Sequence, residues 1–224
     1  MIVVQVEGNI GAGKSTFLNQ FKEKLSNNDK CKHLNVKYVN EPLQKWMNVD
    51  NDCNLFDLYY ENPKKYAEVF QILTFGTMLN INLTCNYENI DIVFMERSLY
   101  TNIHCFVKLL LDQNYVDPIF DKVLKSLFKT FKDKIIHPDI VIYLQTDNIV
   151  TLQKRISTRG RTAEKDIPTE YLTNLNNIYN DVINNHDYFN KSSKHIIPIE
   201  MTKEEQASKY FDKIIKNIIN KLNL

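Results

Sequence analysis

The stretch GNIGAGKS, residues 8–15, places three of the five glycines of a 224-residue sequence directly before a lysine and a serine. This spacing fits the pattern G-x-x-x-x-G-K-[ST], in which the backbone curls so that its N–H groups surround an anion. Lys14 is expected to reach the terminal phosphates, and the Ser15 hydroxyl is expected to hold Mg²⁺. The pattern predicts a site that holds a nucleoside triphosphate. The residues expected to contact it are Gly8, Asn9, Gly11, Ala12, Gly13, Lys14, Ser15 and Thr16.

The residues before the two remaining glycines exclude one class of nucleotide-binding protein, the GTPases. A GTPase switch needs the pattern D-x-x-G, but the residues three positions before Gly76 and Gly160 are Leu73 and Ser157. A large mechanical ATPase is not expected at this length. A small kinase remains, and it requires a general base, a metal ligand, cations for the transferred group and an acceptor pocket.

Carboxylates follow two apolar runs. Glu41, in VNEPLQKW, is suited to accept a proton from an acceptor hydroxyl, and Glu96, in FMERS, is suited to hold Mg²⁺. Arg97 could hold the acceptor oxygen and neutralise the phosphoryl group. Taken singly, each of these residues also has a simpler explanation. Glu41 could be an exposed residue before a turn, and Glu96 and Arg97 could form an ion pair on the surface. Because the carboxyl ends of parallel strands meet at one edge of a sheet, we expect them in one crevice.

Three arginines gather in the segment RISTRGRTAEKDIP. Arg155 and Arg159 are four positions apart, on one face of a helix, and Arg161 follows a glycine that permits a bend. A solvated basic helix end would look the same. Like charges on one element nevertheless repel unless an anion lies among them, so we expect a lid over the triphosphate at about residues 155–167.

Apolar runs of strand length alternate with helical patterns along the chain. The expected strands are residues 2–7, 35–42, 91–98, 137–146 and 194–200. The expected helices are residues 15–25, 62–87, 100–111, 117–131, 146–157, 167–189 and 203–222, with Pro63 in a first turn and Asp147 as an N-cap. Runs without alternation are typical of a parallel sheet buried on both faces. We expect one α/β domain over residues 1–224, with about five parallel strands and helices on both faces.

The overall composition excludes some classes of partner. A formal net charge of +1 offers no electrostatic footprint for nucleic acid or an acidic membrane. The four cysteines lack metal-ligand spacing, and no apolar run reaches membrane-spanning length. With a strand expected from the first residues, no targeting segment is seen, and we expect a soluble, cytoplasmic protein.

Several motifs occur together in one order: GNIGAGKST, then EP…W, then FQ within a long helix, then ERS, then R-x-x-x-R-G-R-x-x-E and IP-x-EYL. In this order, over nearly the whole chain, the sequence resembles the deoxyribonucleoside kinase family. The resemblance implies a P-loop kinase fold, ATP with Mg²⁺ as the phosphate donor, and the 5′-hydroxyl of a small-molecule deoxynucleoside as the acceptor. It also implies a homodimer built through two helices. Residues 100–111 and 168–188 could supply apolar faces for it, although burial in the core of the chain would explain those faces equally well.

The resemblance also implies roles for individual residues. Glu41 matches the general base, Arg97 the contact to the 5′ oxygen, and Glu96 a magnesium-associated carboxylate. Transfer would rest on Glu41, Arg97, Lys14 and Arg159, with the lid arginines Arg155, Arg159 and Arg161. Tyr60 and Glu164 match the pair that binds the 3′-hydroxyl; Trp46, Phe70 and Phe106 match aromatics around the base; Gln71 matches the residue that reads its edge.

The segment FQILTFGTM agrees with a pocket on one face of a helix. Helical spacing places Gln71, Thr74 and Met78 together, and an amide that donates and accepts at once suits a pyrimidine edge. Phe70 and Met78 would equally suit plain core packing. A glycine inside a helix, such as Gly76, lowers the stability of the helix by about 1 kcal/mol relative to alanine. We therefore expect a neighbouring segment to approach Gly76 too closely for a side chain.

Two positions depart from the family pattern. Members that accept deoxycytidine or purines commonly carry Arg where this chain has Met78 and Asp where it has Asn102. The branch that resembles mitochondrial thymidine kinase and the insect multisubstrate kinase has Met with a small residue. Loss of the Arg charge opens room for a 5-methyl group, which favours thymidine and other pyrimidines, while Asn102 leaves purines open.

Two other functions remain open from the sequence. A nucleoside monophosphate kinase resembling thymidylate kinase shares loop, sheet and lid, but the Glu41 carboxylate would repel an acceptor that already carries a phosphate. A catalytically inactive, nucleotide-binding regulatory protein would share the same fold. Against it, Glu41, Glu96, Arg97 and the lid arginines are all present.

Overall fold

The computed structural model describes residues 1–201, 205 and 207–223. Part of the helix predicted over residues 203–222 therefore lies outside the described residues. Its remainder comprises a π-helical turn, η5 (Ala207–Phe211), and α11 (Asp212–Leu222).

A five-stranded parallel sheet forms the centre of the molecule, as predicted. Its strands are β1 (Ile2–Gly8), β2 (Val36–Val39), β3 (Ile92–Glu96), β4 (Ile140–Gln145) and β5 (Ser193–Pro198), in the order β2-β3-β1-β4-β5. The central strands β1 and β3 are buried at every residue because both faces are covered by helices. The register pairs Val6 with Glu96 and Gly8 with Leu144, so the carboxyl ends of three strands lie together.

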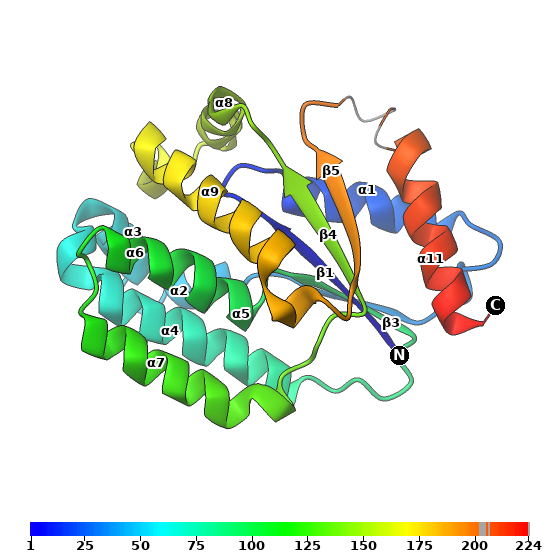
Figure 1. Cartoon of the computed structure of the whole chain (residues 1–224), viewed down its shortest axis with the longest axis horizontal. Coiled ribbons are helices and arrows are strands. Elements are labelled where there is room, and N and C mark those ends of the chain that lie inside the picture. Colours follow the sequence, from blue (N-terminus) through cyan, green and yellow to red (C-terminus); the bar gives the residue numbers. More distant parts are fainter. Residues whose placement is uncertain (202–204, 206, 224) are drawn as a thin grey trace.

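Helices cover both faces of the sheet (Figure 1). The helices before β4 are α1 (Lys14–Ser26), α2 (Leu43–Met47), α3 (Leu55–Glu61), α4 (Pro63–Thr84), α5 (Leu99–Thr101), α6 (Lys108–Asp112) and α7 (Pro118–Phe131). After β4 come α8 (Ile149–Arg159) and α9 (Thr169–Asn185), and the 3₁₀ turns are η2 (Lys132–Lys134), η3 (Thr162–Glu164) and η4 (Asp187–Phe189). On one face Phe17 and Phe21 of α1 pack against Phe211, and on the other Tyr179 of α9 stacks on Tyr143.

Several local predictions need correction. The N-cap of α8 is Asn148, whose side chain accepts from the Val150 N–H at 3.1 Å, and not Asp147. The helix predicted over residues 100–111 is interrupted by a π-helical stretch, η1 (Asn102–Val107). The short helices α2 and α3 were not predicted, because five and seven residues are too few to show a helical period.

Gly76 lies on an exposed part of α4. A Cβ built there would meet no atom of the chain within 4 Å. The expectation of a close neighbour is therefore wrong within this chain.

The two segments expected to supply a dimer face bury their apolar side chains within the chain, among them Leu109, Leu110, Leu172 and Leu175. Large exposed apolar side chains lie instead on α4 and α7: Val69, Ile72, Leu83, Ile119, Val123 and Leu127. None of the helices in the described part of the chain has the length and apolar character needed to cross a bilayer.

Candidate active site

Two neighbouring cavities open at the carboxyl edge of the sheet, with volumes of about 510 Å³ and 760 Å³. The smaller extends toward α4, and the larger lies over the glycine loop. The two are contiguous, because the same five side chains line both: Lys14, Ser15, Glu96, Arg159 and Arg161. An elongated ligand pair could therefore meet end to end at these residues.

The glycine loop has the conformation that its sequence requires. Gly8, Gly11 and Gly13 all have positive φ, and a Cβ on Gly11 would lie 2.8 Å from the carbonyl oxygen of Leu152. A side chain is excluded there by both strain and space. The loop is fixed to α9 through the Asn9 side chain, whose Nδ2 donates to the Leu172 carbonyl at 2.8 Å.

Lys14 is buried at the centre of the loop. Its Nζ donates to the carbonyl oxygens of Asn9 at 3.0 Å and Gly8 at 3.3 Å. Burial, and then the charge of Arg97, lower the pKa of Lys14 to about 8. An anion in the loop would favour the charged ammonium and compensate for both effects.

Ser15 and Glu96 lie side by side where the two cavities meet. The Ser15 Oγ is 3.1 Å and 3.2 Å from the two carboxylate oxygens of Glu96. Hard oxygen donors of this kind suit Mg²⁺, which is usually held by one or two protein groups together with substrate phosphates. The Ser15–Glu96 pair therefore fits a metal shared with a bound triphosphate. The described part of the chain contains no cluster of three or more His, Cys, Asp or Glu residues that could hold a metal ion.

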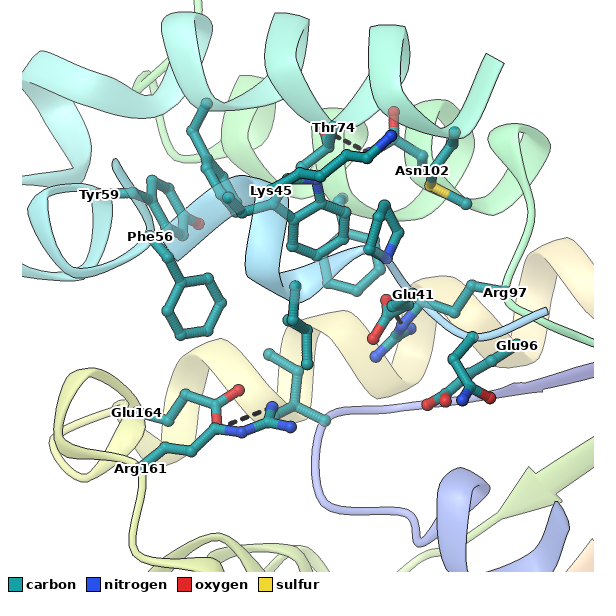
Figure 2. Close-up of a pocket in the computed structure, with 18 of the residues that line it drawn as sticks. Glu41, Lys45, Phe56, Tyr59, Thr74, Glu96, Arg97, Asn102, Arg161 and Glu164 are labelled. Atoms are coloured by element: carbon teal, nitrogen blue, oxygen red, sulfur yellow. Dashed lines mark hydrogen bonds and ion pairs between the residues drawn. The ribbon is translucent and has the colours of Figure 1, made fainter. Parts of the chain in front are cut away.

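Arg97 connects the glycine loop with Glu41. Its Nε lies 2.6 Å from Oε1 of Glu41, and its Nη1 donates to the Gly8 carbonyl at 2.9 Å and to the Tyr179 hydroxyl. Figure 2 shows Glu41 and Arg97 pointing toward one another from different elements. The guanidinium also lies 4.7 Å from the centre of the Phe106 ring. Burial opposes its charge, but Tyr179 and the carboxylates of Glu41, Glu7 and Glu96 together outweigh burial and raise the pKa of Arg97.

A buried carboxylate that the sequence analysis overlooked lies behind this pair. Glu7 is fully buried, and its Oε1 accepts from the Ser98 and Thr101 hydroxyls at 3.1 Å and 2.9 Å and from Gln5. Burial raises its pKa, partly offset by the charge of Arg97. An acidic residue inside an apolar strand was the available signal, since such groups are rarely buried unless partnered. Its network fixes the first turn of α5, directly after Arg97.

The far end of the smaller cavity is apolar and aromatic, apart from one cluster of hydrogen-bonding groups. Trp46 meets the edge of Phe70, and Trp46 Nε1 donates to the Thr77 hydroxyl at 2.8 Å. The predicted shared face of α4 is present, because Gln71, Thr74 and Met78 all line this cavity. Further lining aromatics that were not predicted are Phe56, Tyr59 and Tyr171.

The three arginines predicted for the lid divide between two sets of partners. Arg155 donates to the carbonyl oxygens of Ala12 at 3.0 Å and Ile199 at 2.7 Å, which ties α8 to the glycine loop. Arg159 and Arg161 instead form ion pairs with Glu164, the latter at 3.5 Å. In this structure the Glu164 carboxylate neutralises Arg159 and Arg161, and Figure 2 shows it beside Arg161. The triphosphate expected among these arginines stays a prediction.

The structure brings nearly all of the predicted residues to these two cavities. The smaller is lined by the residues predicted for the acceptor: Glu41, Trp46, Tyr60, Phe70, Gln71, Thr74, Met78, Arg97, Asn102, Phe106 and Glu164. The larger is lined by Gly11, Ala12, Gly13, Thr16 and Arg155 in addition to the shared side chains. Of the predicted set, Gly8 and Asn9 line neither cavity. Their backbone carbonyls accept from Lys14 Nζ, and the Asn9 side chain holds the loop against α9.

Comparison with known proteins points to one family. A fowlpox virus protein described as a probable deoxycytidine kinase is 32% identical over 176 residues, covering 77% of this chain and 67% of its own length. Human deoxycytidine kinase is 28% identical over 198 residues, covering 77% and 71%. Mitochondrial thymidine kinase 2 of Macaca fascicularis is 29% identical over 180 residues, covering 80% and 63%.

The model of the deoxynucleoside kinase family matches residues 4–222, which is nearly the whole chain and includes both cavities. An anion-binding loop, an adjoining cavity and a carboxylate–arginine pair between them are what such a kinase requires. The chain therefore belongs to the deoxynucleoside kinase family and is an ATP-dependent kinase.

Proposed function

We propose that this enzyme transfers the γ-phosphoryl group of ATP to the 5′-hydroxyl of a pyrimidine deoxynucleoside, thymidine among them. The observation that carries the proposal is the position of the Glu41–Arg97 pair, which lines the smaller cavity beside the side chains shared with the glycine loop. A substrate hydroxyl beside this pair would have the Glu41 carboxylate, which can accept its proton, on one side. The phosphates held by the glycine loop would lie on the other side.

In this proposal Glu41 accepts the proton of the 5′-hydroxyl, and Arg97 holds the same oxygen and balances the charge that develops. Lys14, Arg159 and Arg161 contact the phosphates. Ser15 and Glu96 would hold Mg²⁺, which neutralises the triphosphate when it is bound. We assign residues 155–167 as the lid of a single domain, with Gly160 in the left-handed conformation at the end of α8 as its bend.

The acceptor would lie with its sugar near Tyr60 and Glu164 and its base near Gln71. Met78 supports a pyrimidine, because it is buried and apolar and gives a 5-methyl group an uncharged neighbour. The relatives include a mitochondrial thymidine kinase and deoxycytidine kinases, whose named substrates are both pyrimidine nucleosides.

A panel of acceptors tests this assignment. We expect kcat/KM with ATP and magnesium to be higher for thymidine and deoxycytidine than for deoxyadenosine and deoxyguanosine, and negligible for thymidine monophosphate. A clear purine preference would overturn the pyrimidine assignment. Faster turnover of the monophosphate would overturn the hydroxyl acceptor.

We also propose a homodimer through the exposed apolar side chains of α4 and α7. The two helices are joined near both ends, since Glu68 accepts from the Asp117 N–H at 2.8 Å and Asn82 from the Ile136 N–H at 3.2 Å. Light scattering should give twice the chain mass of 26.4 kDa. Ile72→Glu and Val123→Glu should reduce it to one chain mass, whereas Val150→Glu, on exposed α8, should not. A wild-type protein at one chain mass would exclude the dimer.

A further inference from the structure

Glu7 is a carboxylate that the proposed mechanism does not use. It is the last side chain of β1 before the glycine loop and is fully buried, at 0% exposure. It lines neither of the two cavities at the carboxyl edge of the sheet, so it does not face a bound nucleoside or triphosphate. A buried charge lowers the stability of a protein unless opposite charges and hydrogen-bond donors surround it. The surroundings of Glu7 therefore indicate what its side chain does.

Three donors converge on one oxygen of this carboxylate. Glu7 Oε1 accepts from the Thr101 hydroxyl at 2.9 Å, from the Ser98 hydroxyl at 3.1 Å and from the Gln5 amide. Each hydroxyl oxygen in turn accepts a backbone N–H, Ser98 Oγ from Thr101 at 3.1 Å and Thr101 Oγ1 from Ser98 at 3.4 Å. Both hydroxyl hydrogens are thus available to Glu7, and three donors favour an ionised carboxylate.

The other oxygen of Glu7 has no donor. Oε2 is buried and accepts no hydrogen bond from any described residue, so its charge is balanced by a nearby cation. Burial raises the pKa of Glu7, and the charge of Arg97 is the largest effect that opposes this rise. The Lys14 ammonium also faces Glu7. The other titratable groups that face it stay uncharged at neutral pH, because burial raises the pKa of each: Cys105 of η1, Tyr143 of β4, Tyr179 of α9 and Tyr188 of η4.

Arg97 is shared between two carboxylates. Its Nε lies 2.6 Å from Glu41 Oε1 at the wall of the smaller cavity (Figure 2), and its charge is also attracted by Glu7, which lies outside that cavity. The backbone joins them as well, because the Arg97 N–H donates at 3.0 Å to the carbonyl of Val6, the neighbour of Glu7. The first turn of α5, which Glu7 holds, begins directly after Arg97. Glu7 thus fixes Arg97 both through the chain and through its charge.

The charges at this edge of the sheet leave Arg97 with two partners during the reaction. In the proposed function the Lys14 ammonium faces the triphosphate and the Glu96 carboxylate faces the metal ion, so Glu41 and Glu7 remain to balance Arg97. Once Glu41 accepts the hydroxyl proton it is neutral. A buried guanidinium without a counter-charge would oppose that step by lowering the basicity of Glu41. A second carboxylate that keeps its charge removes this obstacle.

We propose that Glu7 is a positioning residue that holds the Arg97 guanidinium from outside the cavity, so that Glu41 is free to accept the proton. This inference rests on the proposed function, since it assumes that Glu41 is the general base. It goes further in assigning to the proton transfer a second carboxylate, one that touches neither substrate.

Glu7→Gln tests the charge with almost no change of shape. The amide oxygen can still accept from Ser98 and Thr101, but the negative charge is lost. We expect the single-turnover rate of phosphoryl transfer to fall about tenfold, while the Kd for thymidine stays within about twofold of the wild type. The acid limb of the rate–pH profile should move down by about one pH unit, because Arg97 then acts on Glu41 alone. Glu7→Asp keeps the charge and should restore the limb and part of the rate.

Asp121→Asn is the matched control, because it also removes a buried carboxylate, on α7 and outside both cavities. It should change the thermal stability but neither the rate nor the acid limb. An unchanged rate in Glu7→Gln would overturn the inference. So would a lower rate with an unmoved limb, since loss of packing alone gives that result, or a limb that moves as far in Glu7→Asp as in Glu7→Gln.

If Glu7→Gln does not fold, the wild type still decides. The NMR shift of the Glu7 carboxyl carbon, identified through its absence in Glu7→Asp, should be that of an ionised group at neutral pH, and a neutral acid would overturn the role. If no deoxynucleoside is phosphorylated, or if Glu41→Gln keeps near-normal turnover, the proposed function itself fails. Loss of turnover in Glu41→Gln together with an unaffected Glu7→Gln would overturn only the role of Glu7.

Discussion

Arg97 Nε lies 2.6 Å from Glu41 Oε1, although the two residues are 56 positions apart and follow different strands. Arg97 reaches this position with φ of 64°, in the left-handed region that a residue with a side chain adopts only when its surroundings require it. Because Arg97 also binds the Gly8 carbonyl, one buried cation links the carboxylate to the start of the phosphate loop. This link defines where the transferred group would pass.

Glu41→Gln should lower kcat by about 10²–10⁴-fold, because the amide cannot accept the hydroxyl proton. Binding of the nucleoside should be nearly retained, since the amide has almost the same shape. Stopped-flow turnover with calorimetric Kd values separates the two effects, and thermal melting checks the fold. Near-normal turnover would remove Glu41 from the mechanism.

Affinity for ATP should weaken as the pH rises above about 8. The pKa of free Lys14 is about 8, lowered by burial, and phosphates beside the ammonium must raise it in the complex. The Lys14 ammonium, which binds the phosphates of ATP, is thus present in the free enzyme below about pH 8 and is lost above it. Calorimetric measurement of the Kd for ATP from about pH 7 to about pH 9.5, a range that brackets this pKa, should show the loss of affinity. Lys14→Arg stays charged and should remove the dependence, and a flat wild-type profile would contradict the assignment.

Glu164→Gln should change the two Michaelis constants in opposite directions. Loss of the carboxylate frees Arg159 and Arg161, whose side chains are 34% and 32% exposed, so KM for ATP should fall by up to about fivefold. KM for the nucleoside should rise at least about tenfold, because the sugar hydroxyl loses a charged acceptor. Glu170→Gln, exposed on α9, is the matched control. Parallel changes in both constants would exclude competition for Glu164.

The free energy of unfolding should fall as the pH drops from about 6.5 to about 4. Burial, then the neighbouring His186 and Lys125, lower the pKa of His104 to about 4, and Asp121 opposes this shift. The unfolded chain therefore binds this proton first, and acid favours unfolding. His104→Phe should retain the stack on Tyr100 and remove about 1–3 kcal/mol of the pH dependence. Urea denaturation at several pH values measures it, and identical wild-type and variant slopes would contradict this origin.

Local sequence predicted most of the fold. The five strands, the glycine loop and the long helix with Pro63 at its start each depend on residues close in sequence, and all are present in the structure. The N-cap of α8, the helices α2 and α3 and the π-helical segment η1 were not predicted. The position of a cap, a short helix or a π-helical turn depends on one or two hydrogen bonds or on packing. A periodic sequence pattern does not reveal such contacts.

The candidate site shows the same division. Glu41, Glu96 and Arg97 were expected together because parallel strands bring their carboxyl ends to one edge. Glu7 was overlooked because its partners, Ser98 and Thr101, are more than ninety positions away. Glu164 was expected to meet a sugar, and its ion pairs with the lid arginines emerged only from coordinates.

The amino-acid sequence by itself determined the α/β class, the triphosphate loop and the set of residues at the carboxyl edge of the sheet. These follow from short-range spacing and from strand direction, which require no knowledge of distant contacts. Only the tertiary structure decided which apolar helices are buried, that Gly76 faces solvent, and how the Gln71 and Asn102 amides meet. Such relations depend on the packing of side chains from distant segments, where a shift of one ångström makes or breaks a hydrogen bond.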